Sequence, residues 1–158
     1  MKREAWKNYA FYIVLTEAVG LLAGVLTREG TRLYSETITK PPLSPPALLF
    51  PIVWTLLYAL MGISAARISL AEATARQKRA RYLYFAQLAF NFFWSIIFFH
   101  FQSFGIAFFW LLALWALILW MILAFRKIEP LAGYLQIPYL VWVSFAGYLN
   151  LGVWLLNK

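Results

Sequence analysis

The longest uncharged stretch of this sequence runs from Tyr82 to Phe125, 44 residues without a Lys, Arg, Asp or Glu. A helix of about 20 apolar residues crosses the hydrocarbon core of a bilayer, so this stretch predicts two crossings joined by a tight turn. Further apolar stretches cover residues 9–26, 50–66 and 131–157. With 63% hydrophobic and 13% charged residues, the chain has too little polar surface to enclose a water-soluble core.

These stretches predict an all-α membrane protein that folds as a single transmembrane domain, a five-transmembrane-helix bundle. The expected helices cover residues 6–27, 45–69, 79–101, 104–126 and 130–156. Ser44 before Pro45 is typical of a helix N-cap and predicts the start of the second helix. Pro51 and Pro138 fall inside expected helices and predict kinks there.

The first loop, about residues 28–44, is long for a helical bundle. It ends in tandem prolines, which favour a stiff and extended chain. A stiff, non-helical loop over one end of a bundle predicts the lid or wall of a binding site, and a plain surface connector is the alternative. Pro41 and Leu43 of this loop are therefore candidate ligand contacts.

Basic residues predict the orientation in the membrane. Ten of the 14 Lys and Arg residues lie on the side of the N-terminus, and the other side holds Arg28, Arg32, Lys40 and Lys158. Because cytoplasmic loops are enriched in basic residues, we expect the N-terminus in the cytoplasm. This topology also accounts for the net charge of +8, so no nucleic-acid partner is expected.

Polar side chains inside the apolar stretches are costly in a membrane and mark either function or hydrogen bonds between helices. Asn91 lies near the middle of the third expected helix and suits a ligand contact or an interhelical bond. Glu17 faces the bundle interior or, in a tilted helix, lies near the interface. His100 is the only histidine and the chain has no Cys, so we expect neither a metal site nor a resident cofactor.

Aromatic residues make up 20% of the chain, and several lie too deep for the interfacial belt. Residues three or four apart share a helix face, which groups six candidate wall residues into three pairs: Trp54 and Tyr58, Asn91 and Trp94, and Trp142 and Ala146. These faces predict a stacking pocket for a flat hydrophobic ligand such as a sterol or a tetrapyrrole. Packing between helices or exposure to lipid is the alternative.

Gly20 and Gly24 give the first helix a Gly-x-x-x-Gly spacing, which allows a second helix to approach closely. A dimer seam and packing within one chain both remain open as the role of this pair.

Three segments of the sequence resemble the translocator protein family, also called tryptophan-rich sensory proteins or peripheral-type benzodiazepine receptors. The segments are KPPLSPP at 40–46 with VWTLLYALMG at 53–62, NFFWS at 91–95, and PYLVW at 138–142 with Asn150 and Trp154. Together with the chain length and the five-helix layout, the order of these segments indicates a prokaryotic member of this family.

The resemblance implies a dimeric five-helix bundle that binds porphyrins, haem-related tetrapyrroles, sterols and benzodiazepine-type drugs beneath the first loop. The six wall residues named above fall on the family's pocket positions. In some bacterial members, tryptophans that match Trp54 and Trp142 support light-dependent breakdown of protoporphyrin. The chain departs from the family pattern at Leu43, where the family has a tryptophan, and at Trp110, where it has an aspartate.

The resulting hypothesis is a receptor or transporter-like membrane protein for tetrapyrroles, acting in stress sensing or porphyrin handling. Arg28, Arg32 and Lys40 are the candidate partners of the ligand's propionates. We expect a binding protein and not an enzyme. The alternatives are light-dependent porphyrin oxidation that uses Trp54 and Trp142, and a scaffold that binds membrane lipid or a partner protein.

Overall fold

The computed structural model describes the backbone of residues 2–158 and the side chains of residues 4–158. Its elements in chain order are α1 (Lys2–Leu26), α2 (Arg28–Thr37), α3 (Leu49–Ser69), α4 (Ala75–Ser95), the π-helix η1 (Ile96–His100), α5 (Phe104–Ile128), α6 (Pro130–Tyr134) and α7 (Ile137–Leu156). Among the described residues, five segments are long and apolar enough to cross a membrane: Glu4–Leu26, Leu49–Ser69, Ala75–His100, Phe104–Ile128 and Pro130–Leu156. The predicted all-α fold with five transmembrane segments is confirmed.

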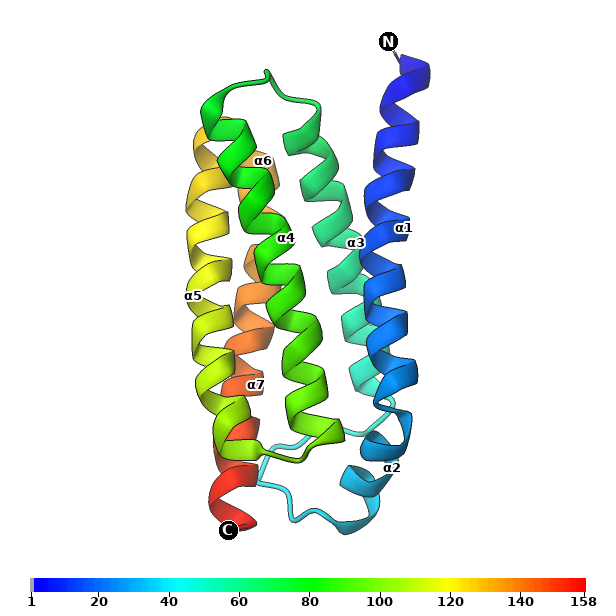
Figure 1. The fold of residues 1–158 in the computed structure, drawn as a ribbon, viewed down its shortest axis with the longest axis vertical. Coiled ribbons are helices and arrows are strands. Elements are labelled where there is room, and N and C mark those ends of the chain that lie inside the picture. The colour runs from blue at the N-terminus through cyan, green and yellow to red at the C-terminus, as the bar shows by residue number, and fades with distance from the viewer. Residues whose placement is uncertain (1) are drawn as a thin grey trace.

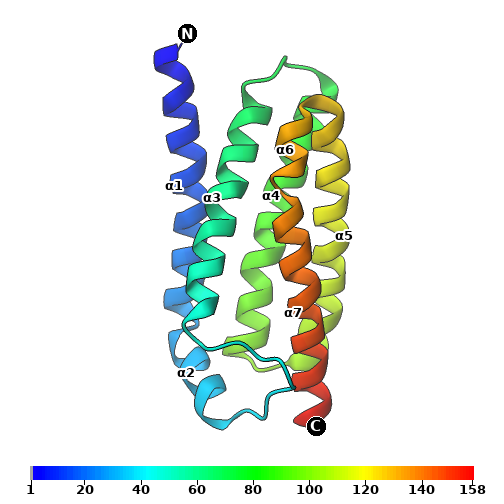
Figure 2. The same cartoon turned by 180° about the vertical axis from the view of Figure 1, so that it is seen from behind.

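The five long segments form an elongated bundle with the N- and C-termini at opposite ends (Figure 1). α1 packs mainly against α3, and α5 packs against both α4 and α7. The short helix α2 and the chain that follows it cross the end of the bundle where α7 finishes, as Figure 2 shows from behind. This crossing segment closes one end of the bundle.

α1 and α3 cross at close range because Gly62 has no side chain. A Cβ built at Gly62 would lie 2.6 Å from the Cα of Ile13, closer than such atoms approach in proteins. Gly20 on α1 likewise leaves room for the ring of Tyr58. Gly20 therefore packs within one chain, whereas a Cβ built at Gly24 would have no atom within 4 Å.

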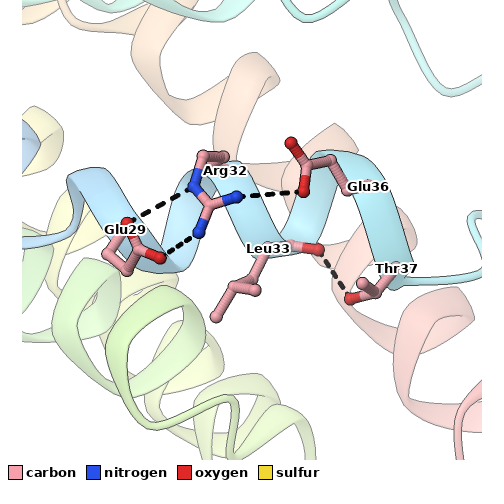
Figure 3. Close-up of polar contacts among 5 residues, drawn as sticks. All are labelled: Glu29, Arg32, Leu33, Glu36 and Thr37. Atoms are coloured by element: carbon pink, nitrogen blue, oxygen red, sulfur yellow. Dashed lines mark hydrogen bonds and ion pairs between the residues drawn. The ribbon is translucent and has the colours of Figure 1, made fainter.

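Residues 28–37 form the helix α2, where the sequence predicts an extended loop. Arg32 pairs with Glu29 and with Glu36 on the exposed face of this helix (Figure 3), while Tyr34 is buried on the other face. Pairs at these spacings stabilise short helices, and the tandem prolines stiffen only the part of the loop after α2. The prediction of a non-helical first loop is wrong for these residues.

Pro51 and Pro138, the two prolines expected inside helices, each lie at the start of a helix. Pro51 is the third residue of α3 and Pro138 is the second residue of α7. N–H groups in the first turn have no intrahelical partner, so Pro51 does not interrupt α3, and the kink predicted there is wrong. The expected helix 130–156 does break directly before Pro138, at residues 135–136 between α6 and α7. The predicted Ser44 cap is also wrong, because α3 begins at Leu49 and the Ser44 hydroxyl donates to the Pro41 carbonyl at 2.8 Å.

An ion pair fixes the start of α6 against α3. Arg67 donates from Nε to Glu129 Oε2 at 2.5 Å and from Nη2 to Glu129 Oε1 at 3.0 Å. These hydrogen bonds from Arg67 lower the pKa of Glu129 below its ordinary value. The pair therefore contributes to stability in a pH-dependent way.

We expect the Glu129→Gln variant to melt on the order of 2–4 °C below wild type at neutral pH, because a partly exposed pair contributes about 1 kcal/mol or less. Since the folded-state pKa of Glu129 is lowered, its contribution is present above the unfolded-state pKa and is lost as pH falls through the folded-state pKa. Acidification should therefore reduce the difference between the two proteins. Glu72→Gln is the control, because no cation among the described side chains pairs with Glu72. A Glu129→Gln difference that stays constant down to strongly acidic pH would contradict this role.

Candidate functional site

A cavity of about 340 Å³ lies beneath α2 at the closed end of the bundle. Small-molecule sites in proteins typically measure about 300–1,000 Å³. α2, the segment after it, the first turn of α3, the end of α4 with η1, and α7 all contribute to the wall. The lining residues are Thr31, Tyr34, Ser35, Lys40, Ser44, Pro45, Ala47, Phe50, Pro51, Trp94, Phe98, Phe99, Ala146, Leu149 and Asn150.

Trp94 is held in one orientation at the wall of the cavity. Its Nε1 donates to Asn150 Oδ1 at 3.1 Å, and Asn150 Nδ2 donates to the Phe104 carbonyl at 2.8 Å. The Phe98 ring stacks on the indole with centroids 5.1 Å apart and ring planes at 28°. The polar groups of this wall are thereby paired within the protein, and the indole offers an apolar surface to a ligand.

α2 forms the roof of the cavity because Gly30 lets it approach η1. A Cβ built at Gly30 would overlap the backbone carbonyl of Phe99, which cannot move away as a side chain can. The Tyr34 ring packs against Phe98 and against Phe99 with centroid distances of 5.5 Å. Burial raises the pKa of the Tyr34 hydroxyl, so the roof presents a neutral phenol.

The segment after α2 is attached to α7 by hydrogen bonds. Asn157 Oδ1 accepts from the Thr39 amide at 3.0 Å, and Asn157 Nδ2 donates to the Thr39 carbonyl at 2.8 Å. The Tyr148 hydroxyl donates to the Pro42 carbonyl at 2.8 Å. Pro41 packs on α7 where a glycine leaves room for its ring, so it serves this attachment and does not line the cavity.

The three candidate propionate partners have different environments. Lys40 lines the cavity, and its Nζ donates to three backbone carbonyls near the end of α2 at 3.0–3.2 Å. The ammonium also lies 4.9 Å from the centroid of the Tyr34 ring. Arg32 forms the ion pairs of Figure 3 and Arg28 is exposed, and neither of them lines the cavity.

Tyr58 and Asn91 belong to a buried hydrogen-bond chain behind the cavity. The Tyr58 hydroxyl donates to Asn91 Oδ1, and Asn91 Nδ2 donates to the Tyr139 hydroxyl, each at 2.8 Å. The Tyr139 hydroxyl then donates to Gln87 Oε1 at 2.8 Å. This chain joins α3, α4 and α7, which is the interhelical role considered for Asn91.

Neither Trp54 nor Trp142 lines the cavity. The Trp54 ring lies 5.5 Å from the Tyr58 ring and 6.2 Å from the Tyr139 ring. The Trp142 ring meets Phe50 edge-on at 5.9 Å, and Phe50 lines the cavity. Trp142 Nε1 is buried and has no hydrogen-bond partner among the described residues.

Two of the six predicted wall residues, Trp94 and Ala146, line the cavity. Sequence reasoning missed Tyr34, Phe50 and Phe98 as wall residues. The amphipathic spacing of α2 could have identified Tyr34. Phe50 and Phe98 carry no such signal, because they are two of 14 phenylalanines in an apolar chain.

The remaining candidate residues lie away from the cavity. Leu43 is 81% exposed, with a left-handed φ of 69°. Glu17 is partly buried within α1. His100 is exposed at the end of η1, with its ring 4.8 Å from that of Phe101.

The composition of the wall suits binding of an apolar ring system. Aromatic and aliphatic side chains dominate it, and Thr31, Ser35, Ser44 and Asn150 supply a few polar groups. The lining residues, all within the described part of the chain, include no His, Asp or Glu that could activate a hydroxyl as a nucleophile.

Comparison with known proteins matches residues 12–155 to the TspO/MBR family. The chain is 37% identical over 149 residues to the tryptophan-rich protein TspO of Chlorobaculum tepidum, covering 94% of each chain. It is 32% identical over 152 residues to the tryptophan-rich sensory protein of Cereibacter sphaeroides, covering 95% of this chain and 93% of that one. It is 33% identical over 157 residues to the translocator protein of Bos taurus, covering 97% of this chain and 92% of that one.

Proposed function

Because the chain belongs to the TspO/MBR family, we propose that it is a receptor or transporter-like membrane protein whose ligand occupies the cavity beneath α2. The proposed ligands are tetrapyrroles such as protoporphyrin and haem-related rings, with sterols and benzodiazepine-type drugs as further candidates. Relatives named for a sensory role and for translocation support a function in sensing or transport, here in porphyrin handling.

The observation that carries this proposal is the aromatic wall formed by Trp94, Phe98 and Tyr34. Burial of a flat apolar ring beside these side chains gains roughly 25 cal/mol for each Å² removed from water. Offset stacking on the fixed indole adds to that gain. A propionate group would meet Lys40 and share or replace its contacts with backbone carbonyls.

Titration of the detergent-solubilised protein with protoporphyrin, followed by tryptophan fluorescence, tests this function. We expect saturable quenching in wild type and an affinity roughly tenfold lower in Trp94→Ala, because the variant loses a stacking surface and leaves Asn150 without its donor. Trp120→Ala is the matched control, since Trp120 is 56% exposed on α5. Equal affinities in all three proteins, or quenching that never saturates, would count against the cavity.

We further propose a homodimer, with Gly24 of α1 at the seam. The open space around Gly24 leaves this position free to meet a second copy, whereas Gly20 packs on Tyr58 of its own chain. Lipid would cover the rest of the apolar surface. A Gly24→Leu variant that keeps the mass of the wild-type particle in detergent would exclude this seam.

For the orientation, we propose that the N-terminal end of the bundle faces the cytoplasm. The chain has no Cys, so a single Lys158→Cys substitution provides a unique label at the other end. A membrane-impermeant thiol reagent should modify it from outside intact cells. Labelling that requires access from the cytoplasmic side would reverse the orientation.

A further inference from the structure

The connection between α2 and α3, residues 38–48, runs past α7 on its way to the start of α3, as Figure 2 shows. Successive residues of this connection contact Asn157, Gly152 and Tyr148 of α7. From Asn157 back to Tyr148, α7 covers nine residues, which is about 13 Å along a helix axis. The connection therefore extends along the side of α7 toward the middle of the bundle.

The contact at Tyr148 lies on the bilayer side of the membrane interface at this end. Trp154 belongs to a residue type enriched at that interface, and the Lys158 ammonium lies 5.9 Å from the centroid of its ring. Tyr148 precedes Trp154 by six residues, about 9 Å along the helix toward the hydrocarbon core. At its other end the connection leads directly into the membrane-spanning segment Leu49–Ser69. Both ends of residues 42–48 are thus attached to helices that cross the bilayer.

Two leucines of the connection present their side chains outward. Leu43 and Leu48 are the two most exposed large apolar side chains among the described residues. Leu43 also has a left-handed φ of 69°, a conformation that glycine or asparagine ordinarily occupies in a loop surrounded by water. Contact with acyl chains would favour a leucine at this position, whereas contact with water would not.

The backbone of this connection has few polar groups that need water. Four of the six residues 41–46 are prolines, which have no N–H group. The carbonyls of Pro41 and Pro42 accept from the hydroxyls of Ser44 and Tyr148, each at 2.8 Å. Because unpaired backbone groups are costly where water is scarce, this composition suits a non-helical chain at the edge of the hydrocarbon core.

We propose that residues 41–48 are embedded in the bilayer, with the backbone at the boundary between headgroups and acyl chains and with Leu43 and Leu48 among the acyl chains. Ile52 and Leu56 follow Leu48 at intervals of four residues on α3, and both are exposed. The apolar surface of the connection therefore continues along one face of a spanning helix, which favours lipid as its partner. This inference depends neither on the ligand of the cavity nor on the orientation in the membrane.

Spin labelling in phosphatidylcholine vesicles tests the proposal, since the chain has no Cys and each substitution gives a unique label. Oxygen concentrates among acyl chains, whereas a neutral nickel chelate stays in water. At Leu43→Cys and Leu48→Cys we expect the ratio of oxygen to nickel collisions to match that at Val141→Cys, which is exposed on the spanning helix α7. The ratio at Glu29→Cys, on the exposed polar face of α2, should be much lower.

These collision rates also distinguish the alternatives. A nickel collision rate at Leu43→Cys as high as at Glu29→Cys would place the connection in water and overturn the proposal. Low rates with both reagents would indicate a protein contact, such as a second copy of the chain, and would overturn it as well. Circular dichroism of each variant checks that the labelled protein remains helical.

The sign of a change in thermal stability gives a second test in bilayer nanodiscs. Asparagine accepts a left-handed φ more readily than leucine, so Leu43→Asn should raise the melting temperature if the side chain meets water. If the side chain meets acyl chains, Leu43→Asn should lower it, because a polar amide replaces an apolar group there. Leu43→Met is the control and should melt with wild type. A melting temperature of Leu43→Asn equal to or above that of wild type would overturn the proposal.

Discussion

Replacement of Ala146 by Phe is expected to abolish protoporphyrin binding while the five-helix bundle still forms. Ala146 is buried on α7 and lines the cavity beneath α2. A phenyl ring in place of its methyl group would occupy the space between α7 and Trp94, where the ligand is expected to stack. We predict a dissociation constant at least about tenfold higher than in wild type, since overlap with a rigid ring costs about 1–3 kcal/mol.

Val141→Phe is the matched control for this prediction. Val141 lies on the same helix and is 64% exposed, so the added ring would point into lipid or detergent. Equilibrium binding of protoporphyrin to the two variants, with circular dichroism as a check of helicity, separates filling of the cavity from general damage. Wild-type affinity in Ala146→Phe would show that the ligand binds elsewhere.

Replacement of Gly30 by Val is expected to detach the roof of the cavity. The built Cβ overlaps the Phe99 carbonyl, and relief requires movement of α2 as a whole. Tyr34 would then leave its contacts with Phe98 and Phe99, and ligand affinity should fall by about tenfold or more. Hydrogen exchange should rise in residues 28–44 while the long helices keep their protection.

Gly24→Val makes the same chemical change on α1, shortly before α2, where a built Cβ meets no atom within 4 Å. Gly24 belongs to the proposed dimer seam and not to the docking of α2 on η1, so the exchange pattern of this variant in residues 28–44 should match that of wild type even where its oligomeric mass changes. If Gly30→Val also left exchange and affinity unchanged, the docking of α2 on η1 would not be needed to form the site.

Long uncharged stretches were sufficient to predict the helical class and the number of membrane crossings. α2 escaped prediction because it is short and polar on one face, and its two ion pairs around Arg32 become visible only when a helix is assumed. The short break between α6 and α7 lies directly before Pro138, where the sequence predicts a kink. Pro138 is compatible with a kink and with a helix start, and only the contacts of the neighbouring helices decide between them.

The candidate site was predicted in part, and the difference lies in helix rotation. Residue spacing places Trp54 with Tyr58 and Asn91 with Trp94 on shared faces, but it does not specify which face meets the cavity. In the structure Trp94 lines the cavity, whereas Asn91 bonds to Tyr58 and Tyr139 behind it. The π-helix η1 also changes the register of the chain after Ser95, and so brings Phe98 to the wall without a signal in the sequence.

The most direct test of the cavity as the ligand site is an experimental structure of the protein with bound protoporphyrin. We predict density for a flat ring beneath α2, stacked against Trp94 and Phe98, with an acidic substituent near Lys40. Density on another face of the bundle, or a cavity filled by its own side chains at saturating protoporphyrin, would contradict the proposed site.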